Sequence, residues 1–246
     1  MRCVGLLGGM SWESTQLYYR LINQGVAARL GGLHSARIVL HSVDFGPVAA
    51  HMAQGEWDAI AQLLCDAARG LRAAGAEALV LATNTMHKLA PQIEAASGLP
   101  LLHIADATGA AIAAAGVQQV GLLGTRPTME ESAVVQDRLR ERHGLTVQVP
   151  EAADRALVHR VIFDELCRGV VTAASRDAYG AVIERLREQG AGGVILGCTE
   201  ITLLIDARSS VLPVFDSTAL HAAAAVDWML GSDALEEQQD PPKGDL

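Results

Sequence analysis

The chain has 246 residues, of which 50% are hydrophobic and 4% aromatic, and its formal net charge is −9 at pH 7. This amount of apolar material is sufficient for one large α/β domain or for two smaller halves. The negative charge argues against nucleic acid and against an anionic membrane surface as partners. It does not exclude a small anionic substrate, which local hydrogen-bond donors rather than net charge would hold.

The first residues enter a strand-like run at once, and neither a cleavable leader nor an apolar run of membrane-spanning length is recognisable. We therefore expect a soluble, cytoplasmic protein with no membrane partner. None of the four cysteines is in CxxC spacing, so we expect reduced thiols at Cys3, Cys65, Cys167 and Cys198.

Short β-rich runs alternate with longer helical stretches, which is typical of parallel α/β sheets. Strands are expected at 3–7, 37–43, 78–82, 100–103, 118–123, 146–149, 193–196 and 211–214. Helices rich in Ala and Leu are expected at 57–73 and 173–188.

Two segments of the chain are repeated at nearly the same period. The sequence VGLLG at 4–8 recurs at 120–124, which is 116 residues later, and 75–83 recurs loosely as 190–198, which is 115 residues later. Two similarities at one period indicate that the halves share a fold. The repeat predicts two similar parallel-sheet α/β domains related by a pseudo-twofold axis, with the active site between them.

The expected first domain comprises residues 1–115 and a C-terminal helix at about 217–230, and the second comprises residues 116–216. A polar tail at 231–246 contains two prolines and is expected to be disordered. Thr83 and Cys198 occupy equivalent positions, each directly after an apolar strand. Because ligands bind beyond the carboxyl ends of parallel strands, both residues should face the cleft between the domains.

Cys198 is the strongest candidate for a catalytic residue, since it opens the run Cys198-Thr199-Glu200 after a strand. A helix start there would lower the pKa of its thiol, whereas the alternative is a buried, inert cysteine. Thr83 opens Thr83-Asn84-Thr85, which predicts either a helix cap or a hydroxyl- and amide-lined cradle for a carboxylate. His87 and Lys88 are more typical of solvated helix positions than of catalysts.

Two glycine-containing loops follow the repeated strands. The diglycine Gly8-Gly9 lets the backbone pass close to a ligand and expose N–H groups, but it is not a dinucleotide fingerprint. In the equivalent loop Thr125 is a candidate ligand, and the run 128–131 partly fits a capping box. Ser14 or Thr15 would cap the helix after the first loop. No histidine spacing predicts a metal site, and no lysine indicates pyridoxal phosphate.

The chain resembles the aspartate/glutamate racemase family. The motifs that carry the resemblance span most of the chain in the order of the family: Gly5-Leu6-Leu7-Gly8-Gly9-Met10-Ser11, Thr83-Asn84-Thr85-Met86-His87, Gly121-Leu122-Leu123-Gly124-Thr125 and Gly197-Cys198-Thr199-Glu200.

The resemblance implies a cofactor-independent amino-acid racemase that acts on aspartate or glutamate and forms a homodimer. Its catalytic pair would be Thr83 and Cys198, and its substrate-binding residues Met10, Asn84, Thr85, Thr125 and Thr199. Many members have cysteine at both catalytic positions, so Thr83 is a departure that resembles a branch specific for L-aspartate and L-glutamate.

Inversion at an α-carbon needs a base on one face and an acid on the other. A thiol gives up its proton more easily than an alcohol, so proton abstraction should be fast on the side of Cys198 and slow on the side of Thr83. A distal carboxylate would need a basic or amide partner, for which Arg126, Arg160, Arg168 and Gln54 are open alternatives. A related decarboxylase that uses Cys198 alone and a non-catalytic amino-acid sensor are the rival functions.

Overall fold

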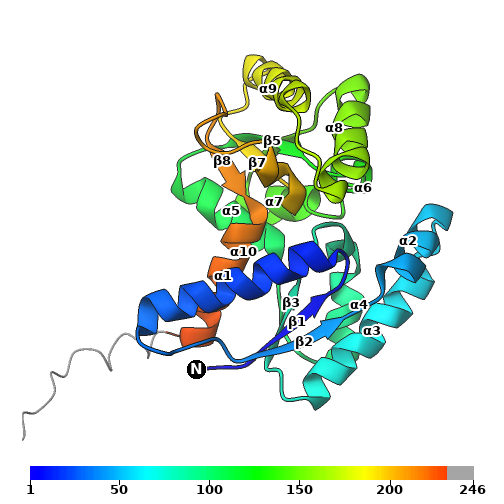
Figure 1. Ribbon diagram of the computed structural model, residues 1–246, viewed down its shortest axis with the longest axis vertical. Coiled ribbons are helices and arrows are strands. Elements are labelled where there is room, and N and C mark those ends of the chain that lie inside the picture. Colours follow the sequence, from blue (N-terminus) through cyan, green and yellow to red (C-terminus); the bar gives the residue numbers. More distant parts are fainter. Residues whose placement is uncertain (232–246) are drawn as a thin grey trace, which may run out of the picture.

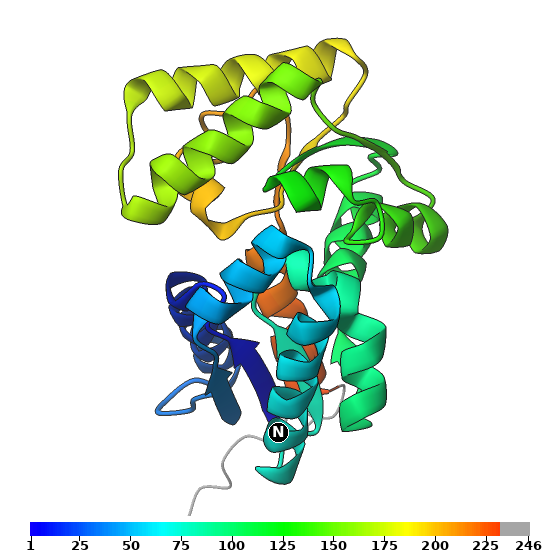
Figure 2. The same cartoon turned by 90° about the vertical axis from the view of Figure 1, so that its right-hand side faces the viewer.

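The computed structural model describes residues 1–231, so the expected disordered tail, apart from Gly231, lies outside the described residues. The chain forms two four-stranded parallel sheets with helices on their faces (Figure 1). In the view turned by 90°, the two halves lie one above the other (Figure 2). The expected α/β class with two similar parallel-sheet halves is therefore confirmed.

The first sheet has the strand order β2-β1-β3-β4. Its elements are β1 (Val4–Gly8), α1 (Trp12–Leu30), β2 (Ile38–Ser42), α2 (Phe45–Gln54), α3 (Trp57–Ala73), β3 (Ala78–Leu81), the 3₁₀-helix η1 (Thr85–Leu89), α4 (Ala90–Ser97), β4 (Leu101–Leu102) and α5 (Ile104–Ala114).

The second sheet has the equivalent order β6-β5-β7-β8. Its elements are β5 (Gln119–Leu123), α6 (Arg126–Glu130), α7 (Gln136–His143), β6 (Thr146–Gln148), α8 (Ala152–Asp164), the 3₁₀-helix η2 (Leu166–Arg168), α9 (Ala173–Glu188), β7 (Val194–Leu196), the 3₁₀-helix η3 (Thr199–Leu203), β8 (Val214–Asp216) and α10 (Ser217–Leu230).

All eight expected strands form, and the largest error in position is at β8. This strand was expected at 211–214 but pairs with β7 only from Val214 onward. Pro213 precedes it and has no N–H group to donate to the sheet. Its carbonyl oxygen nevertheless accepts a hydrogen bond from the amide of Val194 at 2.9 Å, so the proline marks the edge of the paired segment.

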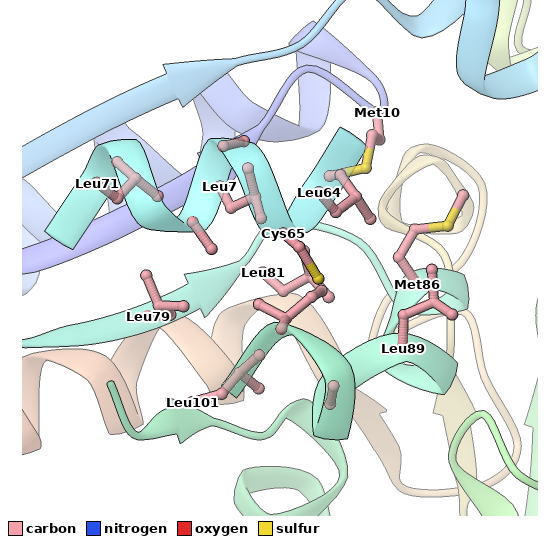
Figure 3. Packing of buried hydrophobic residues seen from close by; sticks show 14 of the residues in the cluster. Leu7, Met10, Leu64, Cys65, Leu71, Leu79, Leu81, Met86, Leu89 and Leu101 are labelled. Carbon is pink, nitrogen blue, oxygen red and sulfur yellow. The ribbon is translucent and has the colours of Figure 1, made fainter. Parts of the chain in front are cut away.

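Helix α3 shows why the helices form where the sequence predicts them. Its buried residues, which include Ile60, Leu64, Ala68 and Leu71, recur at intervals of three and four and so form one apolar face. Leu64 and Leu71 pack there with Leu7 of β1 and with β3, as Figure 3 shows.

Helix α10 follows the last strand of the second sheet but packs against α1 and α5 (Figure 1). Asp216 caps its start by accepting hydrogen bonds from the amides of Thr218 and Ala219. Ala222, Val226 and Met229 are buried in one cluster with residues of β1 and α1. The division into residues 1–115 with 217–230, and 116–216, stays a prediction, and these contacts support it.

Candidate active site

A cavity of about 410 Å³ lies where residues from the carboxyl ends of both sheets meet. All the residues expected to act on or bind a substrate line it: Met10, Thr83, Asn84, Thr85, Thr125, Cys198 and Thr199. A single cavity therefore brings together residues that are up to 189 positions apart in the chain.

The strand topology explains this convergence. Strands β1 and β3 are neighbours at the centre of the first sheet, and β5 and β7 are neighbours at the centre of the second. Each is followed by cavity-lining residues: Met10 after β1, Thr83 after β3, Thr125 after β5 and Cys198 after β7. Carboxyl ends of central parallel strands are the usual position of ligand sites in open α/β sheets.

Cys198 lies at the start of η3, half-buried, with its Sγ donating a hydrogen bond to Oε2 of Glu200 at 2.9 Å. Burial raises the pKa of the Cys198 thiol well above its ordinary value, and the charge of Glu200 and this hydrogen bond raise it further. The expected lowering of the thiol pKa by a helix start is therefore wrong. The short η3 cannot offset the desolvation of a thiolate and its repulsion by a carboxylate.

Glu200 is the functional candidate that sequence reasoning missed. Besides the thiol, its carboxylate accepts hydrogen bonds from Oγ1 of Thr199 at 2.7 Å and from Oγ of Ser11 at 3.3 Å. The Ser14 hydroxyl contacts both Thr199 and Glu200. The available signal was the spacing Cys-Thr-Glu, which places a carboxylate within reach of the thiol.

His87 is buried behind Thr83, so its expected position on a solvated helix face is wrong. Its Nδ1 lies 2.8 Å from the carbonyl oxygen of Thr83, and its Nε2 accepts a hydrogen bond from the amide of Ile104 at 3.2 Å. Burial lowers the pKa of His87 well below its ordinary value, and the nearby His103 and His221 lower it further. The neutral ring with its proton on Nδ1 therefore fixes the backbone of Thr83.

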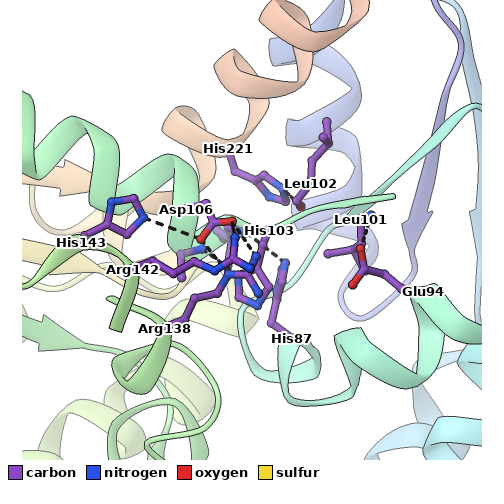
Figure 4. A network of polar contacts seen from close by, with 12 residues as sticks. His87, Glu94, Leu101, Leu102, His103, Asp106, Arg138, Arg142, His143 and His221 are labelled. Carbon is purple, nitrogen blue, oxygen red and sulfur yellow. Dashed lines mark hydrogen bonds and ion pairs between the residues drawn. The ribbon is translucent and has the colours of Figure 1, made fainter. Parts of the chain in front are cut away.

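The three histidines belong to a polar network that joins the two halves (Figure 4). His103 accepts a hydrogen bond from the amide of Ala105 and so caps α5. Asp106 of α5 accepts two hydrogen bonds from Arg138 of α7, at 2.7 and 2.6 Å. Because Asp106 and Arg138 are only partly exposed, this paired geometry fixes α5 relative to α7.

Three threonine hydroxyls meet on the cavity side of this network. Oγ1 of Thr85 lies 3.4 Å from that of Thr125 and 3.2 Å from that of Thr128, and the last two are 3.1 Å apart. The Asn84 amide nitrogen donates to Oγ of Ser217 at 3.2 Å. Hydroxyl and amide groups thus gather around residues 83–85, with much of their hydrogen-bonding capacity already used, and their role as a cradle for a carboxylate stays a prediction.

The structure corrects three local expectations about the loops. The Gly9 amide donates to Oγ1 of Thr15 at 2.8 Å, so it is not free for a ligand. Ser11, rather than Ser14 or Thr15, caps α1 by accepting a hydrogen bond from the Ser14 amide. No capping box forms at 128–131, because Thr128 lies inside α6 and turns toward Thr85 instead.

Only one of the four candidates for a distal carboxylate partner lines the cavity, and this residue is Arg126. Beside it lies His159, whose Nδ1 accepts a hydrogen bond from the Arg126 amide at 3.1 Å. Burial lowers the pKa of His159, and the charge of Arg126 lowers it further. Arg160, Arg168 and Gln54 are not among the described residues that line the cavity.

Residues 1–231 contain no group of three or more His, Cys, Asp or Glu side chains that could hold a metal ion. Within the same described range, no helix is both long enough and apolar enough to cross a membrane.

Comparison with known proteins agrees with this fold. Residues 7–225 match the Asp/Glu/hydantoin racemase family. A candidate Asp/Glu racemase from Yersinia pestis is 56% identical, with a TM-score of 0.89 over 94% of this chain and 100% of that one. An aspartate racemase homologue from Pyrococcus horikoshii OT3 is 29% identical, with a TM-score of 0.80 over 94% of this chain and 100% of that one.

A curated relative has a wider substrate range in its name. The broad specificity amino-acid racemase RacX of Bacillus subtilis (strain 168) is 26% identical over 180 residues, which are 70% of this chain and 74% of RacX. The two parallel four-stranded sheets match the two-domain fold of glutamate racemases of known structure. The chain belongs to the Asp/Glu/hydantoin racemase family.

Proposed function

We propose that this protein is an amino-acid racemase that needs no pyridoxal phosphate and inverts the α-carbon by proton transfer between Cys198 and Thr83. The observation that carries the proposal is that these residues follow equivalent strands, β7 and β3, and line one cavity. A base on one face of the α-carbon and an acid on the other are what inversion requires.

Glu200 is the acceptor for the proton of the Cys198 thiol. The Cys198 thiol is protonated at rest, because burial and Glu200 raise its pKa. When a substrate binds, the thiol proton passes to the Glu200 carboxylate across the 2.9 Å hydrogen bond, and the resulting thiolate removes the α-proton. In the reverse direction the same transfers run backwards, so the Cys198 thiol protonates the carbanion and takes a proton back from a protonated Glu200. Each inversion of an L-substrate leaves Glu200 protonated and Thr83 deprotonated, so a proton returns from Glu200 to Thr83 through water before the next turnover.

Thr83 acts on the opposite face of the α-carbon. Its hydroxyl delivers a proton to the carbanion from the side opposite Cys198 and is a much poorer base in the reverse direction. His87 does not reach the reacting atoms; it holds the carbonyl of Thr83 and thereby positions this residue. The hydroxyls of Thr85, Thr125 and Thr199, with Asn84 and Met10, surround the α-carboxylate and stabilise the charge that develops on it.

Aspartate and glutamate, in their L forms, are the substrates that the family resemblance implies. The names of relatives support two ranges, since the Yersinia pestis protein is described as a candidate Asp/Glu racemase and RacX as a broad specificity enzyme. A cytoplasmic location and a homodimer are further parts of the proposal, and light scattering after size-exclusion chromatography tests the dimer.

The deciding experiment follows loss of the α-proton by NMR in D₂O, and product handedness by chiral chromatography, for a panel of L-amino acids. We expect deuterium uptake together with formation of the D-enantiomer. Cys198→Ala should abolish both, whereas Cys167→Ala, which removes another cavity-lining thiol, should abolish neither. Thr83→Ala should stop inversion while leaving exchange on the side of Cys198.

Other outcomes separate the rival functions. Loss of carbon dioxide from a malonate-type substrate, without exchange of any amino acid, would favour a decarboxylase that uses Cys198 alone. Saturable amino-acid binding with no exchange would favour a sensor.

A further inference from the structure

We infer that the site takes amino acids with an uncharged, apolar side chain, such as methionine, leucine or phenylalanine, in preference to aspartate and glutamate. This inference rests on the proposed function and concerns the part of the cavity that would hold the substrate side chain. It is carried by the residues of α2 and α8 that line the cavity and by the charges around it.

Helix α2 provides an apolar wall from the first half of the chain. Phe45, Ala49, Met52 and Ala53 line the cavity and lie on one face of the helix, at helical intervals of four and three residues. No Lys or Arg occurs from residue 38 to residue 68, so neither this helix nor the loops beside it can supply a guanidinium or ammonium group, and His51 of α2 is already paired with Glu56.

The second half adds apolar groups to the same cavity. Ile162 and Phe163 of α8 line it, together with Pro127 of α6. Phe163 is exposed to 37% although it is a large apolar side chain. Apolar side chains from both halves thus gather in one place, and binding an apolar substrate group would remove their surfaces from water.

The charges of the cavity match a substrate with one carboxylate. Of the described residues that line the cavity, Arg126 is the one Lys or Arg, and His159 has its pKa lowered by burial and by Arg126. Glu200 is the one lining carboxylate. An ordinary amino-acid zwitterion adds one ammonium and one carboxylate, which leaves the positive and negative charges equal.

Aspartate or glutamate would add a second carboxylate, and Arg126, the one Lys or Arg among the described lining residues, would have to balance both carboxylates as well as Glu200. The hydroxyls of Thr85, Thr125 and Thr199 are the groups assigned to the α-carboxylate, and Ser14 is bonded to Thr199 and Glu200, so these donors are not left for a second carboxylate. A desolvated carboxylate without a cation or donors of its own is strongly unfavourable. The preference for an apolar side chain follows from this cost together with the apolar wall.

Turnover and binding by the wild-type protein test the inference. Rates of α-proton exchange in D₂O are compared for L-Met, L-Leu, L-Phe, L-Asp and L-Glu, and thermal stabilisation by each amino acid measures binding without requiring turnover. We expect kcat/KM for the best apolar amino acid to exceed that for aspartate and glutamate by about tenfold or more. Faster exchange or tighter binding of aspartate or glutamate would overturn the inference.

A designed cation provides the matched test. Ala53→Arg places a guanidinium on the cavity-lining face of α2, whereas Ala50→Arg makes the same change at an exposed position of the helix outside the cavity lining. We expect Ala53→Arg to shift the ratio of the glutamate rate to the methionine rate at least about tenfold toward glutamate, and Ala50→Arg to leave it unchanged. Equal ratios in the two variants would contradict the assignment of α2 as the wall of the side-chain site.

The binding measurement separates failure of this inference from failure of the proposed function. Apolar amino acids that bind more tightly than aspartate and glutamate, but are not exchanged, would refute the racemase and retain the substrate class. Exchange confined to aspartate and glutamate would retain the racemase and refute the apolar substrate class.

Discussion

The Sγ atom of Cys198 lies 2.9 Å from Oε2 of Glu200, so the thiol donates a hydrogen bond to a carboxylate two residues away in the candidate active site. The carboxylate has two opposing effects on this thiol. Its charge raises the pKa of Cys198, which disfavours the thiolate, and its Oε2 atom offers the thiol proton a nearby acceptor.

Glu200→Gln separates these two effects. Removing the charge lowers the pKa of the Cys198 thiol relative to the wild type, so alkylation by iodoacetamide near neutral pH should become faster. Racemisation should nevertheless become about ten to a hundred times slower, because the proton acceptor is lost. Rates are measured in a Cys167→Ala background, with Cys198→Ala giving the baseline and Glu200→Asp retaining the carboxylate. An unchanged alkylation profile would show that Glu200 does not control the thiol.

Thr83→Cys should change how often an exchange event leads to inversion. Enantiomers have equal free energies in water, so kcat/KM must be the same in both directions, and asymmetry is visible only in kcat and in the fate of the carbanion. With Thr83 as a weak acid, the recovered L-substrate should gain deuterium faster than the D-enantiomer forms. A thiol at position 83 should raise the fraction of inversion several-fold, whereas Thr83→Ser should leave it near the wild-type value. Equal fractions in all three proteins would refute the assigned role of Thr83.

Acid should unfold the protein through its buried histidines. Burial lowers the pKa of His103 to about 3 and that of His221 to about 4, and His87 shifts in the same direction. The unfolded chain, with histidine pKa values near 6.5, binds more protons below that pH, so these histidines stabilise the fold above about pH 6.5 and progressively destabilise it as the pH falls.

We expect urea unfolding to show a loss of at least about 1 kcal/mol per buried histidine between pH 7 and pH 5. Asp216 opposes the trend slightly, since burial raises the pKa of its carboxyl group. His221→Gln should reduce the pH dependence by about one histidine, and the exposed His34→Gln should not change it. Stability that is constant over this range would contradict the assignment of neutral, buried rings.

Gly9→Ala should destabilise the protein more than other substitutions at glycines of positive φ. Gly9 has a φ of 91°, and a Cβ atom there would lie 2.2 Å from the carbonyl oxygen of Val43. Gly116 has a φ of 71° with nothing within 4 Å of the added atom, so Gly116→Ala measures the conformational cost alone. We expect losses of about 1 kcal/mol for Gly116→Ala and about 3 kcal/mol or more for Gly9→Ala in urea unfolding. Equal losses would mean that the Val43 contact relaxes without cost.

The sequence predicts the strands and the meeting of Thr83 with Cys198 at one cavity because both depend on local pattern and on a repeat. Apolar runs define the strands, and the near-constant offset places the two residues at equivalent strand ends. The error at β8 has a local cause, since the apolar run before Val214 contains a proline that the strand excludes.

Properties that depend on packing could not be predicted in this way. The raised pKa of the Cys198 thiol results from burial and from a side chain two residues away, and the sequence shows neither effect. The role of His87 depends on contacts with Thr83 and Ile104, which are made only when η1 packs against the start of α5. The apolar face of α2 similarly becomes part of a cavity only because residues of α6 and α8 line the same space.

The position of α10 has a consequence for synthesis on the ribosome. Val4, Leu6 and Tyr18, from the beginning of the chain, share one buried cluster with Ala222 and Val226, from near its end. The first sheet therefore lacks part of its cover until residues 217–230 have been made. The second half, whose sheet is complete by Asp216, can close earlier, so the part of the molecule that emerges first finishes folding last.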